Sequence, residues 1–281
     1  MNIDISKFYT FISSFDWNNL FSTLIGAGVG ALGAYCFNLK QAEKLQKEEE
    51  KAQLIQLFYD LHILSKYLCR YASNVQNLAE DICNGLIPYN TPITMDPEII
   101  DIQKLGFITV KSNKMYEILS HTRMELVKIY EQGLIYNEAV VRKKKDSIMQ
   151  LVSICIIFPK LLTMIYVSLY NINSMLIKYY ESENLIKDNI LNQMAEMLEI
   201  IDNAKKQYNT VIESKDMICL YTGKLYTQEQ KDGEKEDLEY IEYVLNEWIL
   251  DFGLNKKQKI KLEEEITKEI GKRQEVVEND L

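Results

Sequence analysis

Turn-forming residues and clustered cysteines are scarce in this sequence of 281 residues. Only 11 glycines and 4 prolines occur, so long stretches run without the residues that usually interrupt helices. The five cysteines are scattered, and none forms the CxxC or Cys/His pattern of a zinc site. The composition therefore predicts an all-α protein with long helices, and with reduced, structural thiols in an intracellular compartment.

Motifs that carry catalysis are lacking as well. The sequence has no Walker A loop and no GxGxxG, GxSxG or HExxH motif, and its only histidines are His62 and His121. Glu117 lies four residues before His121, a common helical spacing, whereas a di-iron bundle uses Glu and His three residues apart, twice, with further carboxylates, and that pattern is missing. We therefore expect a protein that is not an enzyme, with no catalytic, cofactor-binding or metal-binding residues. An enzyme of unrecognised type is the less favoured alternative.

An excess of positive charge is also absent. The net charge of -9 argues against nonspecific binding to nucleic acid, which requires Lys and Arg to neutralise phosphates. One dense basic run exists, and it is a candidate contact for anionic lipid headgroups or for a nucleic acid. A solvated helix surface is the simpler interpretation of only four charges. The run consists of Arg142, Lys143, Lys144 and Lys145.

What the sequence does contain is an uncharged apolar stretch near its N-terminus, at residues 20–39. At about 1.5 Å per residue this stretch matches a hydrocarbon core of about 30 Å. Trp17 precedes it, and Tyr35 and Phe37 lie near its end, where aromatic residues collect at the membrane interfaces. Lys7 is the only basic residue before it, which argues against a cleaved signal peptide. We predict a single transmembrane helix.

The orientation follows from the basic residues that flank this stretch. Positively charged flanks tend to remain cytoplasmic. We therefore predict a short extracytoplasmic N-terminus at residues 1–19 and a cytoplasmic C-terminal domain at the inner (plasma) membrane. Interspersed glutamates make the flank mixed in charge. Its lysines are Lys40, Lys44, Lys47 and Lys51.

Small residues form two rows inside the predicted span. Gly26, Gly30 and Ala34 recur every four residues, and Ala27, Ala31 and again Ala34 form a second row beside the first. Such rows let helices approach closely in lipid, where packing drives association. A helix with two small rows can touch two neighbours, as in a ring, so we expect a homo-oligomer. The general abundance of glycine in membrane helices is the alternative explanation.

Apolar residues recur in heptads after residues 40–53, whose polar composition is typical of a solvated stalk. The pattern predicts one long helix with an a/d seam over about four heptads. This seam can pair between subunits, but its wide apolar stripe favours packing inside the chain's own bundle. The seam residues are Leu54, Leu57, Leu61, Leu64, Leu68, Tyr71, Val75, Leu78 and Ile82.

Further helices complete the bundle domain that we predict at residues 40–221. Within it, residues 151–170 are apolar enough for a second span. However, Pro159 and Lys160 lie at the centre, and a lysine in the middle of a bilayer costs about 2.5–3.5 kcal/mol on insertion scales. We therefore predict a buried central helix, kinked near Pro159, with a second span as the alternative.

Two more helices precede and follow this apolar region. One helix is expected at residues 112–132. A later one is predicted by apolar residues that alternate steps of four and three. Its apolar face consists of Ile190, Met194, Met197, Ile201, Ala204, Tyr208 and Val211.

Residues 222–281 form the predicted C-terminal helical segment. Its first part, residues 222–237, is polar and contains Gly223 and Gly233, which predicts a flexible connection. An apolar face over residues 238–252 then indicates a helix. The charge-rich remainder is expected to be a peripheral amphipathic helix.

This plan, a small-residue span joined to a cytoplasmic helical domain, is similar to that of membrane effectors in prokaryotic phage defence. The likeness lies in the overall plan rather than in a motif. It implies a non-enzymatic protein, anchored in the lipid bilayer, that self-associates and perturbs the membrane. The alternative is a membrane-tethered scaffold or adaptor that binds a protein partner through its helical bundle.

Overall fold

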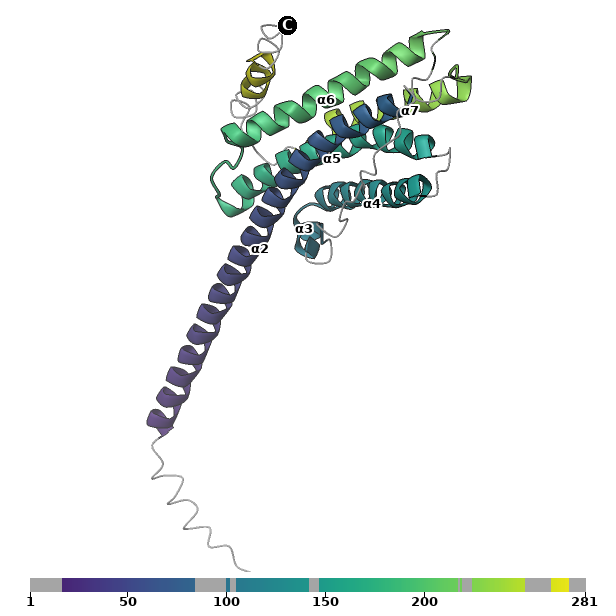
Figure 1. Cartoon of the computed structure of the whole chain (residues 1–281). Helices are drawn as coiled ribbons and strands as arrows, with labels where there is room; N and C mark the ends of the chain where they lie inside the picture. The colour runs from purple at the N-terminus through teal and green to yellow at the C-terminus, as the bar shows by residue number, and fades with distance from the viewer. Residues whose placement is uncertain are drawn as a thin grey trace, which may run out of the picture. The chain divides into compact units, whose positions relative to one another are not determined.

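The computed structural model of the chain describes residues 17–83, 100–101, 105–141, 147–216, 218, 224–250 and 264–272. These residues are almost entirely helical (Figure 1). They contain no β-strand, only an isolated antiparallel bridge between Ile218 and Leu225. The predicted all-α class is confirmed. The chain divides into two compact units, Met1–Glu50 and Lys51–Leu281.

The helices follow one another with short connections where these are described. A further helical segment occupies residues 264–272. The labelled helices are α2 (Trp17–Cys83), α3 (Gly106–Lys111), α4 (Asn113–Val141), α5 (Ser147–Tyr180), α6 (Asp188–Glu213) and α7 (Gln228–Glu247).

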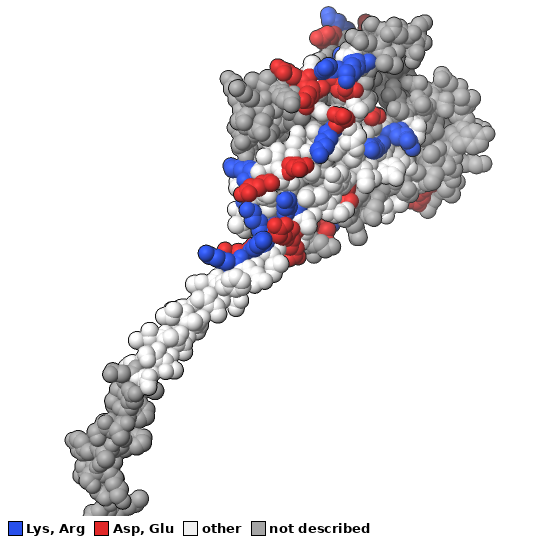
Figure 2. All heavy atoms as spheres, turned by 90° about the vertical axis from the view of Figure 1, so that its left-hand side faces the viewer, with Lys and Arg blue, Asp and Glu red and all other residues white. Residues whose placement is uncertain are grey.

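The first unit is described from Trp17 onward, where α2 begins. This start lies three residues before the predicted span. Residues 21–49 of α2 are all exposed. Figure 2 shows the described part of the apolar stretch in white, with blue and red side chains only beyond its C-terminal end. Its helical backbone satisfies its own hydrogen bonds, so no neighbouring element is needed to form it.

Helix α5 is the centre of the second unit. It packs against α4, α6 and α7. Residues 161–176 are all buried, because apolar side chains surround the whole circumference of the helix rather than one face. The predicted buried central helix is thereby confirmed over these residues. Pro159 lies inside α5, as expected, and the hydroxyl of Thr163 donates to its carbonyl at 2.7 Å.

Buried polar side chains of α5 bind three neighbouring segments. Asn171 Nδ2 donates to the carbonyl of Trp248 at 2.7 Å, and its Oδ1 accepts from the amide of Leu250 at 2.8 Å. Asn173 Oδ1 accepts from the amide of Leu185, in the connection to α6, at 2.8 Å. The hydroxyl of Ser168 lies 3.3 Å from that of Thr122 on α4. These polar groups of α5 are therefore paired across the bundle.

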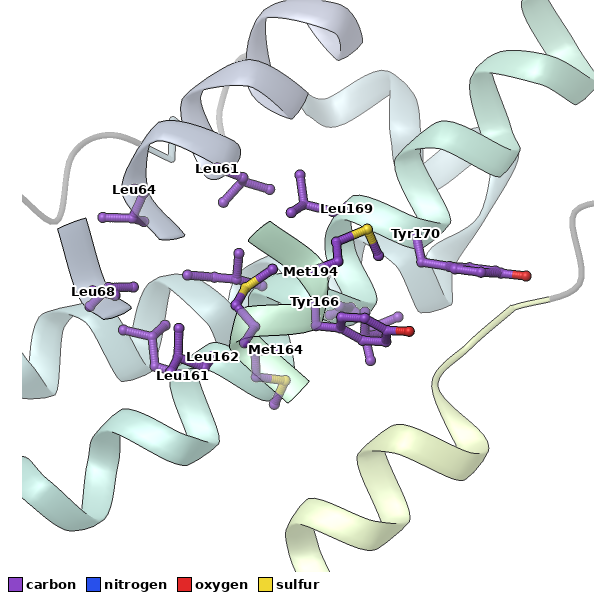
Figure 3. Close-up of a cluster of buried hydrophobic side chains, with 14 of the residues drawn as sticks. Leu61, Leu64, Leu68, Leu161, Leu162, Met164, Tyr166, Leu169, Tyr170 and Met194 are labelled. Carbon is purple, nitrogen blue, oxygen red and sulfur yellow. The ribbon is translucent and has the colours of Figure 1, made fainter. Parts of the chain in front are cut away.

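Helix α2 closes the core of this unit with its seam residues. Figure 3 shows Leu61, Leu64 and Leu68 beside leucines and methionines of α5 and α6. A polar contact joins the same helices, because Gln193 Nε2 on α6 lies 3.3 Å from Cys69 Sγ on α2. The remaining labelled core residues in this view are Leu161, Leu162, Met164, Tyr166, Leu169, Tyr170 and Met194.

The apolar face predicted for α6 is confirmed, since every one of its seven residues is buried. The flexible connection predicted over residues 222–237 is wrong from Gln228 onward, where α7 begins. The reason is local. The Thr227 hydroxyl accepts from the amide of Gln230, whose side chain accepts from the amide of Thr227. This capping box starts a helix despite the dense charge that follows and despite Gly233.

Helix α7 belongs to the same compact unit as α4, α5 and α6, and it packs against α5 and α6. The predicted helix at residues 112–132 also extends further, since α4 continues past Gly133 to Val141. A single glycine lowers helix propensity by only about 1 kcal/mol, which packing of both flanks offsets. Residues 84–99 and 251–263 lie outside the described residues.

Candidate membrane-facing site

The candidate site is the apolar stretch of α2. Helix α2 is long and apolar enough to cross a membrane, and none of its most apolar window is buried within the chain. The polar side chains at its start are satisfied internally. Thr23 and Ser22 donate their hydroxyls to the carbonyl of Asn19, at 2.7 Å and 3.3 Å. A helix whose hydroxyls bond to its own backbone has few unsatisfied groups to carry into lipid.

The residues predicted for self-association, Gly26, Ala27, Gly30, Ala31 and Ala34, are all exposed on this helix. Apart from adjacent residues and the nearby backbone of α2 itself, a Cβ atom built on Gly26 or Gly30 meets no atom within 4 Å. The small residues therefore accommodate nothing in the chain's own fold. Their size leaves a flat helix surface that another helix could approach closely.

Helix α5 passes the same test of length and composition over Ser153–Tyr180, but 72% of its apolar window is buried. Lys160 decides its environment. The Lys160 ammonium forms an ion pair with the carboxylate of Asp237 on α7, and both side chains are about one-fifth exposed at 21% and 20%. Paired and partly exposed, this lysine avoids the desolvation that a bilayer would impose.

A second carboxylate, that of Glu234, lies about one helical turn before Asp237 on α7. Burial, followed by the negative charge of Asp237, raises the pKa of Glu234 to about 7, while Lys160 acts in the opposite direction. Burial also raises the pKa of the Tyr208 hydroxyl on α6, and the negative charges of Glu234 and Asp237 raise it further. Lys160 thus pairs with Asp237, while a carboxylate oxygen of the neighbouring Glu234 is buried without a hydrogen bond.

The two histidines are packing residues. Burial lowers the pKa of His62, and the Lys66 charge lowers it further, so the imidazole is neutral at pH 7. The His121 ring lies edge-on to the Trp248 ring, with 5.2 Å between centroids. Glu117 does not pair with His121, because its carboxylate lies 3.2 Å from the ammonium of Lys114. No group of three or more metal-binding side chains occurs among the described residues.

The described seam residues of α2 lie in the chain's own core. Leu54, Leu57, Leu61, Leu64, Leu68 and Val75 are buried, and Tyr71 is half-buried. This placement favours the intrachain alternative for the seam. The side chains of Leu78 and Ile82 lie outside the described residues, as do Arg142, Lys143, Lys144 and Lys145.

Sequence reasoning missed the acidic partner of Lys160. A lysine inside an apolar helix requires a carboxylate, and that requirement was a signal that a further acidic segment packs against α5. The TQEQ sequence at residues 227–230, a capping-box pattern, was a second signal that this segment is helical. Comparisons with protein-family models, with curated proteins and with solved structures find no match for this chain.

Proposed function

We propose that this protein is a non-enzymatic, single-pass membrane protein that α2 anchors in the inner (plasma) membrane and that acts there by self-association. One observation carries the proposal. The uncharged stretch at residues 21–39 of α2 is exposed along its whole length, although it holds large apolar side chains such as Phe21 and Leu24. Burying each such side chain contributes roughly 1.5–3 kcal/mol. A lipid bilayer supplies that burial, and its thickness matches the stretch.

The flanking charges support the orientation. Four lysines follow the stretch within residues 40–51, whereas Lys7 is the only basic residue before it. This bias favours a cytoplasmic bundle domain and an extracytoplasmic N-terminus. Helix α2 runs without a break from the stretch to Cys83, so the anchor and the bundle domain share one helix.

Self-association is supported by the exposed small residues of the stretch. A double substitution, Gly26→Ile with Gly30→Ile, tests it. We expect loss of the oligomer in detergent, because isoleucine side chains hold the helices apart. The bundle domain should remain folded, because neither position contacts it. Gly28→Ile is the matched control, since Gly28 is equally open and lies away from the Gly26 and Gly30 face. An oligomer that survives the double substitution contradicts the proposal.

Two modes of action follow from such an assembly, and dye leakage separates them. A membrane-perturbing effector, similar in plan to those of prokaryotic phage defence, would release a trapped dye from liposomes as it assembles. The alternative is a tethered scaffold, which would assemble without leakage and retain a protein partner on its bundle domain. The Gly26→Ile with Gly30→Ile variant should abolish leakage if the protein is a membrane-perturbing effector. It should leave partner binding intact if the protein is a scaffold.

A further inference from the structure

The part of α2 that belongs to the second unit has two apolar faces. Its seam residues are buried in the core, while Tyr59, Ile63 and Tyr67 lie on the opposite face and are 43%, 49% and 55% exposed. Steps of four residues place these three side chains in one row along the helix. We call this row the outer α2 face. Single exposed apolar residues are common on protein surfaces, but a row of three large ones is not explained by the fold.

Opposite charges flank the outer α2 face. Asp60 and Lys66 are three residues before and after Ile63, so they lie roughly 60° to either side of it around the helix. Six residues of separation and a divergence of roughly 120° prevent them from pairing with each other. Asp60 accepts a hydrogen bond from Gln56 at 2.9 Å, and neither Asp60 nor Lys66 forms an ion pair with a described residue.

We infer that the outer α2 face binds the same face of a second copy of this chain, with the two α2 helices parallel. This inference rests on the proposed self-association. In a parallel pair related by a two-fold axis, the Asp60 flank of one copy faces the Lys66 flank of the other. An antiparallel pair would place Asp60 beside Asp60, which like-charge repulsion disfavours.

The occupant is a second copy because α2 also carries the candidate span. Copies inserted in one orientation and associated through their spans bring their α2 helices together in parallel. Because α2 is unbroken, association of the spans raises the effective concentration of the outer α2 face of one copy near that of the other copy. Gln56 and Arg70 border the row at its two ends, so the contact covers about three turns. Such a contact is too small to hold two copies without the anchor.

The test uses full-length protein in detergent micelles, with mass measured across a dilution series. Ile63→Glu should weaken association at least tenfold while the thermal unfolding of the bundle domain is unchanged, because Ile63 is exposed. Met124→Glu is the matched control, an equally exposed apolar residue on α4. The single variants Asp60→Lys and Lys66→Asp should weaken association, and the double variant should restore it. Failure of this rescue overturns the parallel arrangement.

A cysteine variant distinguishes this inference from the proposed function. In native membranes, Ile63→Cys in a Cys36→Ser background should form a cross-link with the mass of two chains. A cross-link to a different protein, or within one chain, overturns the inference by revealing another occupant. If Gly26→Ile with Gly30→Ile gives monomers while Ile63→Glu stays fully oligomeric, the span associates alone. The inference is then wrong, and the proposed function stands. If Ile63→Glu dissociates the oligomer and the glycine variant does not, the outer α2 face is the interface. The proposed intramembrane interface is then wrong.

Discussion

Among the described residues, two helices are long and apolar enough to cross a membrane, and they differ in how far the chain buries them. In α2 the most apolar window is fully exposed, whereas in α5 most of it is buried beneath α4, α6 and α7. Apolar length is therefore not what separates a span from a core helix here. The difference lies in the polar residues, because α5 carries Lys160, Asn171 and Asn173, and each bonds to a group from another segment.

The hydroxyls at the start of the α2 stretch behave differently, since they bond within their own helix. Thr23 bonds to the backbone one turn earlier, and no charged residue occurs from residue 20 to residue 39. Lipid offers no hydrogen bonds, so a segment can enter it only when its polar groups are satisfied from within. Substitutions that change the charge or polarity of either helix test this difference.

The largest effect is expected from charge placed in the exposed stretch. Leu24→Arg with Leu32→Arg should remove the protein from the alkaline-resistant membrane fraction, because each arginine costs about 2.5–3.5 kcal/mol at the centre of a span. Both side chains are exposed, so the bundle domain should keep its circular dichroism spectrum. Leu24→Phe with Leu32→Phe is the control. Continued resistance to extraction by the arginine variant would show that α2 is not the anchor.

A charge in the buried helix should produce the reverse outcome. Leu162 is fully buried, and Leu162→Arg should destabilise the bundle domain by roughly 4 kcal/mol or more, since it buries an unpaired charge. Membrane attachment should persist. Limited proteolysis of the membrane fraction measures both properties, with Leu134→Arg on the exposed surface of α4 as control. Loss of attachment in Leu162→Arg would identify α5 as a span.

A smaller effect is expected from the buried amide that joins α5 to the end of α7. Asn171→Ala leaves the Trp248 carbonyl and the Leu250 amide without their partner, which should lower the free energy of unfolding by about 2–3 kcal/mol. Hydrogen exchange should accelerate first at the amide of Leu250. Asn203→Ala, on the exposed surface of α6, should change neither quantity. Equal exchange in the two variants would contradict the role of Asn171.

The smallest effect is a pH dependence centred on Glu234. Its pKa is about 7 in the folded chain, above the ordinary value of 4.5, so the folded state binds more protons between these values. Folding stability therefore falls as the pH rises from about 4.5 to 7, by roughly 1–2 kcal/mol after allowance for solvent screening. Glu234→Gln should flatten this part of a denaturation profile, whereas Glu236→Gln, exposed on the same helix, should not. Parallel profiles for all three proteins would rule out this titration.

Prediction from the sequence succeeded where one helix contains all the necessary information. The α6 face, from Ile190 to Val211, follows from its spacing alone, and every member is buried. Prediction failed at α7 because the density of charge over residues 222–237 outweighed a local signal, the Thr227 capping box. The pairing of Lys160 with Asp237 joins residues that are far apart in the chain, and no periodic pattern specifies such a contact.

The order of the residues is sufficient for three properties: the all-α class, the charge-free stretch at residues 20–39 and the spacing of each apolar face. These properties are local, because backbone hydrogen bonds and side-chain periodicity act within one helix. The sequence predicted a buried α5 but left a second span as the alternative, and the packing of the bundle shows α5 covered and the apolar stretch of α2 uncovered. Burial depends on which segments pack together, and that choice is made by contacts between residues distant in the chain, such as Asn171 with Trp248.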